Sequence, residues 1–283
     1  MSLLSNKKSP TIISGIRDIA HAYDVFFIDL WGVVYEGKTC FPKAKECLEF
    51  LKENGKHVWF MSNTPHKGIM FQNILEECNI PKSLYYGIYT GGQVAYDYLK
   101  DLPSDSLSRW GACYAFNQEE AEHWAKGLRW KITDDIRQSD FILGLSVSPS
   151  FDDTEGFEAL LHEARKKNIP FLSINSDRIA RKDKHFERRV GLLAESYEKR
   201  NGFVVWFGKP QKSFYQFIIS QYGDQPVRFI GIGDTLETDI LGASQMGIDS
   251  ILILRGTHEP ELFSPKNKFM VKKAGQLCET HNL

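Results

Sequence analysis

Short runs of apolar, β-branched and aromatic residues alternate along the chain with longer segments whose apolar positions recur every three or four residues. The short runs are typical of buried strands, and the longer segments of amphipathic helices. The runs predict strands at 25–29, 57–61, 85–89, 203–207, 227–232 and 250–254, and helices at 44–53, 68–78, 93–100, 212–222 and 238–246. Strands that alternate with helices predict the α/β class, with a parallel sheet covered by helices.

The middle of the chain has a similar alternation. It predicts strands at 112–116, 141–146 and 170–174, with helices at 118–127 and 156–167. The charge-dense segment 183–189 is expected to be a solvated loop or helix face. A chain of 283 residues suits one large domain or two modest ones.

Composition and charge narrow the class of protein. With 42% apolar and 25% charged residues, the chain is typical of a globular protein rather than a disordered or collagen-like one. The net charge of −1 gives no overall basic field, so nucleic acid is not expected as a partner. The apolar runs are too short to span a membrane, and no signal peptide is recognisable. We therefore expect a cytoplasmic protein without a membrane partner.

Five cysteines occur, and no CxxC pair is among them. An odd number without metal-ligand spacing favours free thiols in a reducing compartment over disulfides or zinc. The cysteines are Cys40, Cys47, Cys78, Cys113 and Cys278.

Polar residues stand at or just after the ends of four of the predicted strands. Asp29 ends the first, Ser62 follows the second, Lys209 follows 203–207 and Gly208, and Asp234 follows 227–232 and Gly233. The carboxyl ends of parallel strands lie at one edge of a sheet, where ligands bind. These four residues are therefore expected to meet in one cleft.

Their chemistry is coherent with phosphoryl transfer. A carboxylate can attack phosphorus to form an aspartyl phosphate, while an amine and a hydroxyl hold the phosphoryl oxygens. Clustered carboxylates repel one another unless a cation joins them, and Mg2+ prefers such oxygen ligands. Asp239, five residues after Asp234, is placed to support that ion.

The motifs occur in the order of a known superfamily. The motifs are Asp29-Leu30-Trp31-Gly32-Val33, Ser62-Asn63, Gly208-Lys209-Pro210 and Gly233-Asp234-Thr235-(x)3-Asp239. Together they resemble the haloacid dehalogenase superfamily. The last two resemble its class IIA, the NagD-like and 4-nitrophenylphosphatase-like enzymes. The resemblance implies a Rossmann-like core of residues 1–90 and 202–283, with an inserted α/β cap at 91–201. The first motif further resembles a subgroup with Asp-x-Trp-Gly-Val.

The resemblance also implies a role for each matching residue. Asp29 would be the nucleophile and Lys209 would hold it against the phosphate. Ser62, Asn63 and Gly32 would bind phosphate. Mg2+ would be held by Asp29, the Trp31 carbonyl, Asp234 and Asp239. In the cap segment Ile174-Asn175-Ser176-Asp177, Asn175 and Asp177 would contact the substrate.

Trp31 departs from the superfamily pattern. Phosphatases of this family usually carry an aspartate at that position, which protonates the leaving alcohol and then activates water. Indole can do neither, and a positioned acid–base contributes roughly 10²–10⁴-fold. Hydrolysis of alkyl phosphates is then expected to be slow, unless another group substitutes. Tyr35, Glu36 and His66 lie near the motifs in sequence.

Two functions follow from these residues. The first is an Mg2+-dependent phosphohydrolase, monomeric or homodimeric, that acts on a small phosphorylated metabolite such as a sugar phosphate or nucleotide monophosphate. The second is a catalytically weakened phospho-metabolite binding or regulatory protein, which Trp31 favours.

Overall fold

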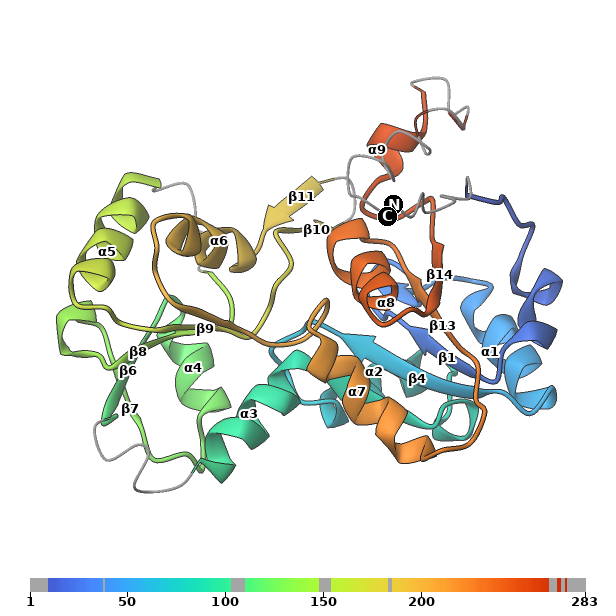
Figure 1. Cartoon of the computed structure of the whole chain (residues 1–283), viewed down its shortest axis with the longest axis horizontal. Coiled ribbons are helices and arrows are strands. Elements are labelled where there is room, and N and C mark those ends of the chain that lie inside the picture. Colours follow the sequence, from blue (N-terminus) through green and yellow to red (C-terminus); the bar gives the residue numbers. More distant parts are fainter. Residues whose placement is uncertain are drawn as a thin grey trace, which may run out of the picture.

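The computed structural model has two lobes, each built around a parallel five-stranded sheet (Figure 1). It describes residues 10–37, 39–102, 110–147, 154–182, 185–264, 269–270 and 273. We call the lobe that holds both ends of the described chain the core lobe, and the other the cap lobe. In the described residues no helix combines the length and apolar character needed to cross a membrane.

The core lobe carries the sheet that begins with the first predicted strand. The sheet order is β14-β13-β1-β4-β5, with every neighbouring pair parallel. Its strands are β1 (Val25–Ile28), β4 (His57–Ser62), β5 (Gly87–Thr90), β13 (Phe229–Gly233) and β14 (Asp249–Leu252). Its helices are α1 (Ala44–Glu53), α2 (Ile69–Glu77), α7 (Lys212–Ile219), α8 (Leu241–Gln245) and α9 (Glu259–Leu262).

Alternate residues of β1 explain why helices cover both faces of this sheet. Phe26 and Ile28 pack with α1 and α2 on one face, while Val25 and Phe27 pack with α7 on the other. Successive side chains of a strand point to opposite faces of the sheet, so a strand without polar residues is buried on both faces. The predicted doubly covered parallel sheet is confirmed.

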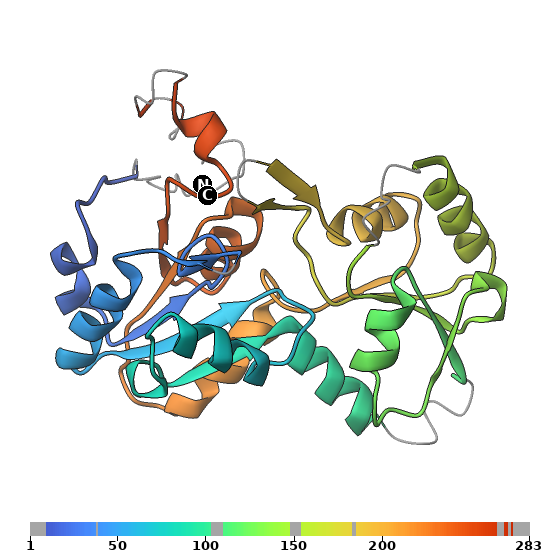
Figure 2. The same cartoon turned by 180° about the vertical axis from the view of Figure 1, so that it is seen from behind.

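The cap lobe has its own sheet, in the order β12-β9-β8-β6-β7. Its strands are β6 (Ala112–Ala115), β7 (Lys131–Thr133), β8 (Phe141–Gly144), β9 (Phe171–Ser173) and β12 (Val204–Trp206). Its helices are α3 (Gly91–Asp101), α4 (Gln118–Trp124), α5 (Thr154–Lys166) and α6 (Gly191–Lys199). α3 and α4 pack on one face, and α5 and α6 on the other. Figure 2 shows α3, in teal, leading from the core lobe to the cap lobe.

The sheet topology corrects one predicted strand. Segment 203–207 was expected in the core sheet, but β12 pairs with β9 in the cap sheet. The chain leaves α6 beside β9 and extends the cap sheet before it returns to the core. The cap sheet therefore includes residues up to Trp206, whereas the prediction assigned residues from 202 onward to the core.

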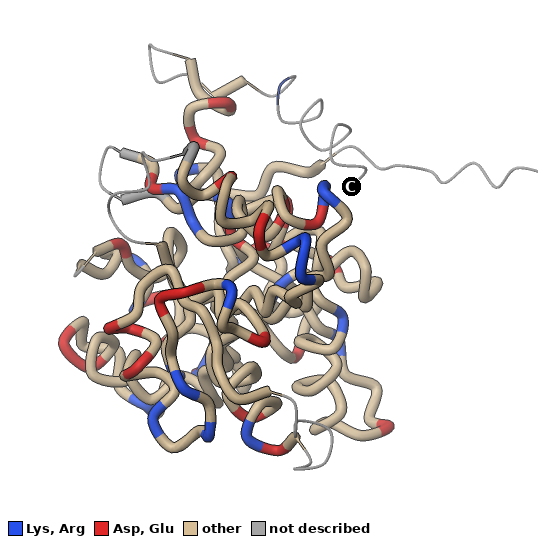
Figure 3. Tube along the Cα trace, turned by 90° about the vertical axis from the view of Figure 1, so that its left-hand side faces the viewer, with Lys and Arg blue, Asp and Glu red and all other residues tan. Residues whose placement is uncertain are grey.

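Two short hairpins and several single turns complete the described elements. The hairpins are β2 (Tyr35–Glu36) with β3 (Thr39–Cys40), and β10 (Ile179–Lys182) with β11 (His185–Arg188). Within the charge-dense segment 183–189, predicted as a loop or helix face, residues 185–188 thus form a strand of the second hairpin, and 183–184 lie outside the described residues. The single turns are Ile16–Asp18, Ala20–Ala22, Lys82–Leu84, Ile136–Gln138, Ser220–Tyr222 and the π-helical Leu236–Ile240. Acidic and basic residues are interspersed along the trace in Figure 3, in keeping with the small net charge.

The expectation of free thiols throughout is wrong. Cys40 and Cys78 form a disulfide between the β2–β3 hairpin and the end of α2. Their Cα atoms are 5.7 Å apart, within the range that a disulfide spans. Because they lie 38 positions apart, their spacing carries no motif that would reveal the pair. Cys47 and Cys113 are free thiols, and Cys278 lies outside the described residues.

Replacing Cys40 by serine should lower the free energy of unfolding by about 2–4 kcal/mol, because the unfolded chain is no longer constrained. Chemical denaturation without reductant measures this change, and dithiothreitol should bring the wild type to the level of the variant. Cys47→Ser, which removes a free thiol in α1, is the matched control. Equal stability of Cys40→Ser and wild type without reductant would contradict the disulfide.

Candidate active site

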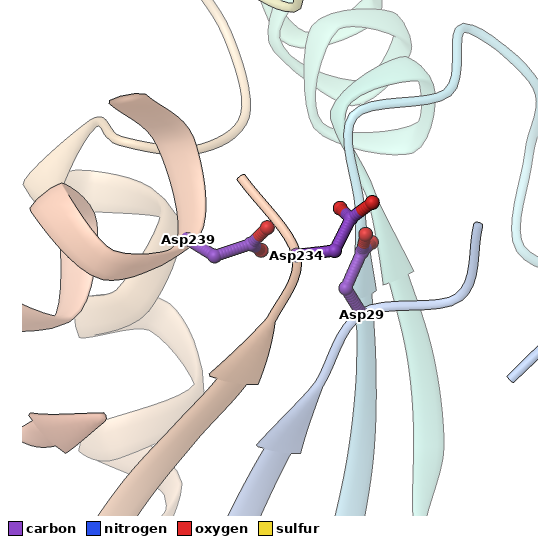
Figure 4. A group of neighbouring side chains, drawn as sticks. All are labelled: Asp29, Asp234 and Asp239. Atoms are coloured by element: carbon purple, nitrogen blue, oxygen red, sulfur yellow. The ribbon is translucent and has the colours of Figure 1, made fainter. Parts of the chain in front are cut away.

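Three carboxylates converge at the carboxyl ends of the core strands (Figure 4). Asp29 follows β1, Asp234 follows β13, and Asp239 lies in the π-helical turn after β13. Each offers one carboxylate oxygen to a group whose members all lie within 4.8 Å of one another. All three residues are buried. The structure therefore brings together the acids that the sequence placed at this edge.

The Lys209 ammonium lies between two of these acids. Its Nζ donates to Asp29 Oδ1 at 2.8 Å and to Asp239 Oδ1 at 2.7 Å. Lys209 is only 3% exposed. Burial opposes its charge, but the facing carboxylates of Asp239 and Asp29 outweigh burial and hold the pKa of the ammonium well above its usual value. Lys209 therefore stays charged at neutral pH.

The carboxylates outnumber the ammonium. Burial raises the pKa of Asp29 well above its usual value, although the Lys209 ammonium lowers it. The carboxylates of Asp239 and Asp234 add to the rise. Burial likewise raises the pKa of Asp234 and of Asp239. Three buried carboxylates with one ammonium leave an excess of negative charge that a hard divalent cation offsets. The donor set of carboxylate oxygens fits such a cation.

Neighbouring backbone and hydroxyl groups orient the acids. Asp234 Oδ2 accepts from the backbone N of Thr257 at 2.8 Å and from its hydroxyl at 3.0 Å, while Oδ1 accepts from the Thr235 hydroxyl at 3.0 Å. Asp239 Oδ2 accepts from the backbone N of Thr235 at 3.2 Å. Partners of this kind fix the direction of metal-ligating oxygens. The sequence did not reveal Thr257, whose signal is its place shortly after the last core strand.

Gly32 lies against the Asp234 carboxylate. Its φ of +80° is in the left-handed region, and an added Cβ would lie 2.4 Å from Asp234 Oδ2. A side chain here would strain the backbone by about 1–2 kcal/mol and push the carboxylate aside. The predicted phosphate-binding glycine is therefore also needed for the position of Asp234.

Gly32→Ala should weaken Mg2+ binding by about tenfold or more, because a displacement costing about 1.4 kcal/mol already has that effect. Calorimetric titration with Mg2+ measures it. Gly37→Ala is the matched control, since Gly37 also has a positive φ, of +64°, but open space at its Cβ. Equal Mg2+ affinity of the two variants would contradict the contact.

Ser62 is the last residue of β4, the strand beside β1, and Asn63 follows it. The pairing of Ile28 with Phe60 places Ser62 next to the motif that begins at Asp29. Ser62 is buried, and its Oγ accepts from the backbone N of Thr64 at 3.4 Å. Asn63 Oδ1 accepts from the backbone N of Lys209 at 2.7 Å. Asn63 thus joins two of the predicted motifs through a hydrogen bond.

The cap segment after β9 reaches this edge as well. Asn63 Nδ2 donates to Asp177 Oδ1 at 2.8 Å and to Ser176 Oγ at 2.9 Å, and the Ser176 hydroxyl donates to the Lys209 carbonyl. Asn175 is buried, and its Oδ1 accepts from the backbone N of Asp177 at 2.8 Å. Ser176, which the sequence did not single out, is a direct contact between cap and core.

Trp31 and its neighbours lie on the core side. The Trp31 ring is half-buried and meets the ring of Tyr35 edge-on, with centroids 5.6 Å apart. Tyr35 is buried, and burial raises the pKa of its phenol, with a further rise from Asp29. Glu36 lies in the β2–β3 hairpin. His66 lines a cavity of about 680 Å³ with residues of α2 and α4.

Comparisons with known proteins agree with this fold and these motifs. Residues 26–129 match a family model described as haloacid dehalogenase-like hydrolase, and residues 206–275 match one described as HAD-hydrolase-like. Mouse chronophin is 25% identical over 260 residues, covering 88% of this chain and 86% of the relative. Phosphoglycolate phosphatase 2 of Arabidopsis thaliana is 23% identical over 280 residues, covering 90% and 91%.

Solved structures share the two-lobed architecture. A haloacid dehalogenase-like hydrolase from Brucella suis 1330 superposes with a TM-score of 0.74 at 24% identity, covering 86% of this chain and 93% of its own. NagD from E. coli K-12 gives 0.60 at 21% identity, covering 83% and 89%. The p-nitrophenyl phosphatase of Archaeoglobus fulgidus gives 0.63 at 18% identity, covering 92% and 93%.

The chain thus has the fold of haloacid dehalogenase-like hydrolases, with a Rossmann-like core and an α/β cap, as the sequence predicts, and two of its segments match family models of these hydrolases. The haloacid dehalogenase-like hydrolase model and the relatives named as phosphatases support a phosphatase.

Proposed function

We propose that the protein is an Mg2+-dependent phosphohydrolase that cleaves small phosphorylated metabolites through an aspartyl phosphate on Asp29. The observation that carries this proposal is the buried group of Asp29, Asp234 and Asp239 with the Lys209 ammonium between two of them. Carboxylates at this separation, one of them at the end of a central strand, are suited to holding a cation beside a nucleophile.

The residues of the chain divide the work between attack and charge stabilisation. The Asp29 carboxylate attacks phosphorus, and the Lys209 ammonium offsets the charge on the phosphoryl oxygens. The Ser62 hydroxyl binds the same oxygens, and Asn63 and Gly32 contribute to the phosphate-binding position beside it. Asp29, the Trp31 carbonyl, Asp234 and Asp239 would hold Mg2+, which would supply Lewis-acid stabilisation of that charge when bound. Asn175 and Asp177 contact the rest of the substrate.

The relatives support the class of substrate rather than one compound. Their names include chronophin, phosphoglycolate phosphatase and, in rat, glycerol-3-phosphate phosphatase at 24% identity. A solved neighbour is described as a possible sugar phosphatase. We propose a small phosphate monoester, such as a sugar phosphate or nucleotide monophosphate, chosen by the cap lobe. We further propose that the core and cap lobes are two domains and that the protein is a monomer or homodimer. The chain is also proposed to belong to the subgroup with Asp-x-Trp-Gly-Val in its first motif.

A panel of phosphate monoesters tests the proposal. Phosphate release with Mg2+, lost on chelation by EDTA and restored by Mg2+, is the expected result for at least one class of metabolite. Tight binding of a metabolite without turnover across the panel would instead favour the second function, a phospho-metabolite binding or regulatory protein. The observation that favours this alternative is Trp31, which leaves the usual position of the acid–base without a titratable group.

A further inference from the structure

The proposed hydrolysis needs a proton donor, and this inference rests on that proposed function. An alkoxide leaves phosphorus slowly unless a group protonates it. Trp31 has no usable proton to exchange, and its neighbour Tyr35 is buried with a raised phenol pKa. His66 faces a cavity that it shares with α4. Beyond Tyr35 and His66, the next candidate is a carboxyl group on another element that reaches the phosphate edge of the core.

Asp177 is a carboxyl group that the cap brings to this edge. Its Oδ1 lies 2.8 Å from Asn63 Nδ2, and Asn63 Oδ1 accepts from the backbone N of Lys209 at 2.7 Å. The Lys209 ammonium in turn contacts Asp29 Oδ1 at 2.8 Å. One side chain, Asn63, therefore bridges Asp177 to the residue that holds the nucleophile. Asp177 belongs to the cap segment after β9, so this bridge joins the cap to the core.

The loop that carries Asp177 is held in place. Asn175 Oδ1 accepts from the backbone N of Asp177, and Ser176 donates to the Lys209 carbonyl. Gly191, at the start of α6, lies so close that an added Cβ would be 2.4 Å from the Asp177 carbonyl. A carboxyl group on a loop fixed at both lobes can hold a defined position over a bound phosphate.

The electrostatic surroundings favour the protonated form of Asp177 more than water does. Burial raises the pKa of its carboxyl, and Asp239 adds to the rise. Lys209, the Asn63 amide and Arg189 oppose it, yet the pKa stays above its usual value. The residue itself is half-buried rather than sealed. Charged groups of the core, Lys209 and Asp239, and of the cap, Arg189, thus act together on the Asp177 carboxyl.

We propose that Asp177 is the general acid and base of this enzyme, supplied by the cap in place of the aspartate that Trp31 replaces. In the first half-reaction Asp29 forms a bond to phosphorus, the bond from phosphorus to the ester oxygen breaks, and that oxygen takes the proton of Asp177. In the second, the Asp177 carboxylate takes a proton from water. The water oxygen attacks phosphorus, the bond to Asp29 breaks, and phosphate leaves.

The test compares alkyl with aryl phosphates in Asp177→Asn. We expect kcat/KM for an alkyl phosphate cleaved by the wild type to fall by about 10²-fold or more. For 4-nitrophenyl phosphate, whose leaving group needs no proton, we expect a fall of less than about tenfold. The phosphorylated Asp29 should accumulate during turnover of the aryl ester. The fall of alkyl kcat/KM at high pH, where the wild-type acid is deprotonated, should disappear in the variant.

Ser176→Ala is the matched control, because it removes a contact of the same loop with Lys209 but no acid. It should change the alkyl and aryl rates by the same factor. An equal fall on both esters in Asp177→Asn would overturn the inference. If Asp177→Asn does not fold, the test uses the wild type with a series of esters whose leaving groups differ in pKa. A shallow dependence of kcat/KM on leaving-group pKa supports a general acid, and a steep one overturns it.

Failure of the inference is distinguishable from failure of the proposed function. Hydrolysis that depends on Asp29 but keeps its alkyl-to-aryl ratio in Asp177→Asn rejects the role of Asp177 alone. Absence of any Asp29-dependent hydrolysis in the wild type rejects the phosphohydrolase, and the role of Asp177 with it.

Discussion

Replacing Asp29 by asparagine should reduce phosphate release by about 10⁴-fold or more, because the amide oxygen cannot form the aspartyl phosphate. Asparagine matches the aspartate in size, and its oxygen can still accept from Lys209 Nζ, which lies 2.8 Å from Asp29 Oδ1. The fold should therefore survive the change. Release of phosphate from a substrate found in the panel, with Mg2+ present, measures the effect.

The control for this prediction is Asp224→Asn, which removes an exposed carboxylate from the turn before β13. It should leave the rate unchanged within about twofold. Acid-stable, hydroxylamine-sensitive labelling by a phosphorylated substrate should occur in wild type and not in Asp29→Asn. A variant that kept a tenth of the wild-type rate would place the nucleophile elsewhere.

The core fold could be predicted because each buried strand has a strong local pattern. Residues 25–28 carry no polar side chain, and this is what burial on both faces of β1 requires. Asp29 and Asp234 then follow from one rule, that ligand residues stand at the carboxyl ends of parallel strands. The register that pairs Ile28 with Ile232 and with Phe60 puts those ends side by side.

Lys209 reaches the site by a route that this rule does not describe. The preceding strand, β12, belongs to the cap sheet, and the chain crosses back to the core just before Lys209. Which sheet a short apolar run joins depends on pairing with a distant strand, here β9, and a local pattern cannot specify that partner. The motif around Lys209, rather than its strand, carried the correct prediction of its position near the acids.

Other features depended on contacts between distant segments. α6 was missed, although its buried Leu193, Ala194 and Tyr197 recur at helical spacing. Cys40 and Cys78 pair only once α2 has packed beside the β2–β3 hairpin. The contact between Asn63 and Asp177 joins residues 114 positions apart on two lobes. Local sequence shows that such residues are polar but not where their partners lie.

Replacing Lys209 by methionine should reduce kcat by about 10²–10³-fold and lower the free energy of unfolding by about 3–5 kcal/mol without Mg2+. The loss of activity reflects the missing positive charge on the phosphoryl oxygens. The loss of stability arises because Asp29 and Asp239 stay buried without the ammonium that contacts both. Rate measurements and chemical denaturation of the same preparation give the two values.

Lys212→Met is the matched control, since Lys212 is an exposed residue at the start of α7, three positions further on. It should change stability by no more than about 0.5 kcal/mol. Because Mg2+ also offsets the charge of the carboxylates, its addition should recover part of the stability lost in Lys209→Met and should stabilise this variant more than the wild type. Unchanged stability of Lys209→Met without Mg2+ would mean that the acids do not depend on the ammonium. The inference that the site holds an excess of buried negative charge, on which the proposed cation site depends, would then be rejected.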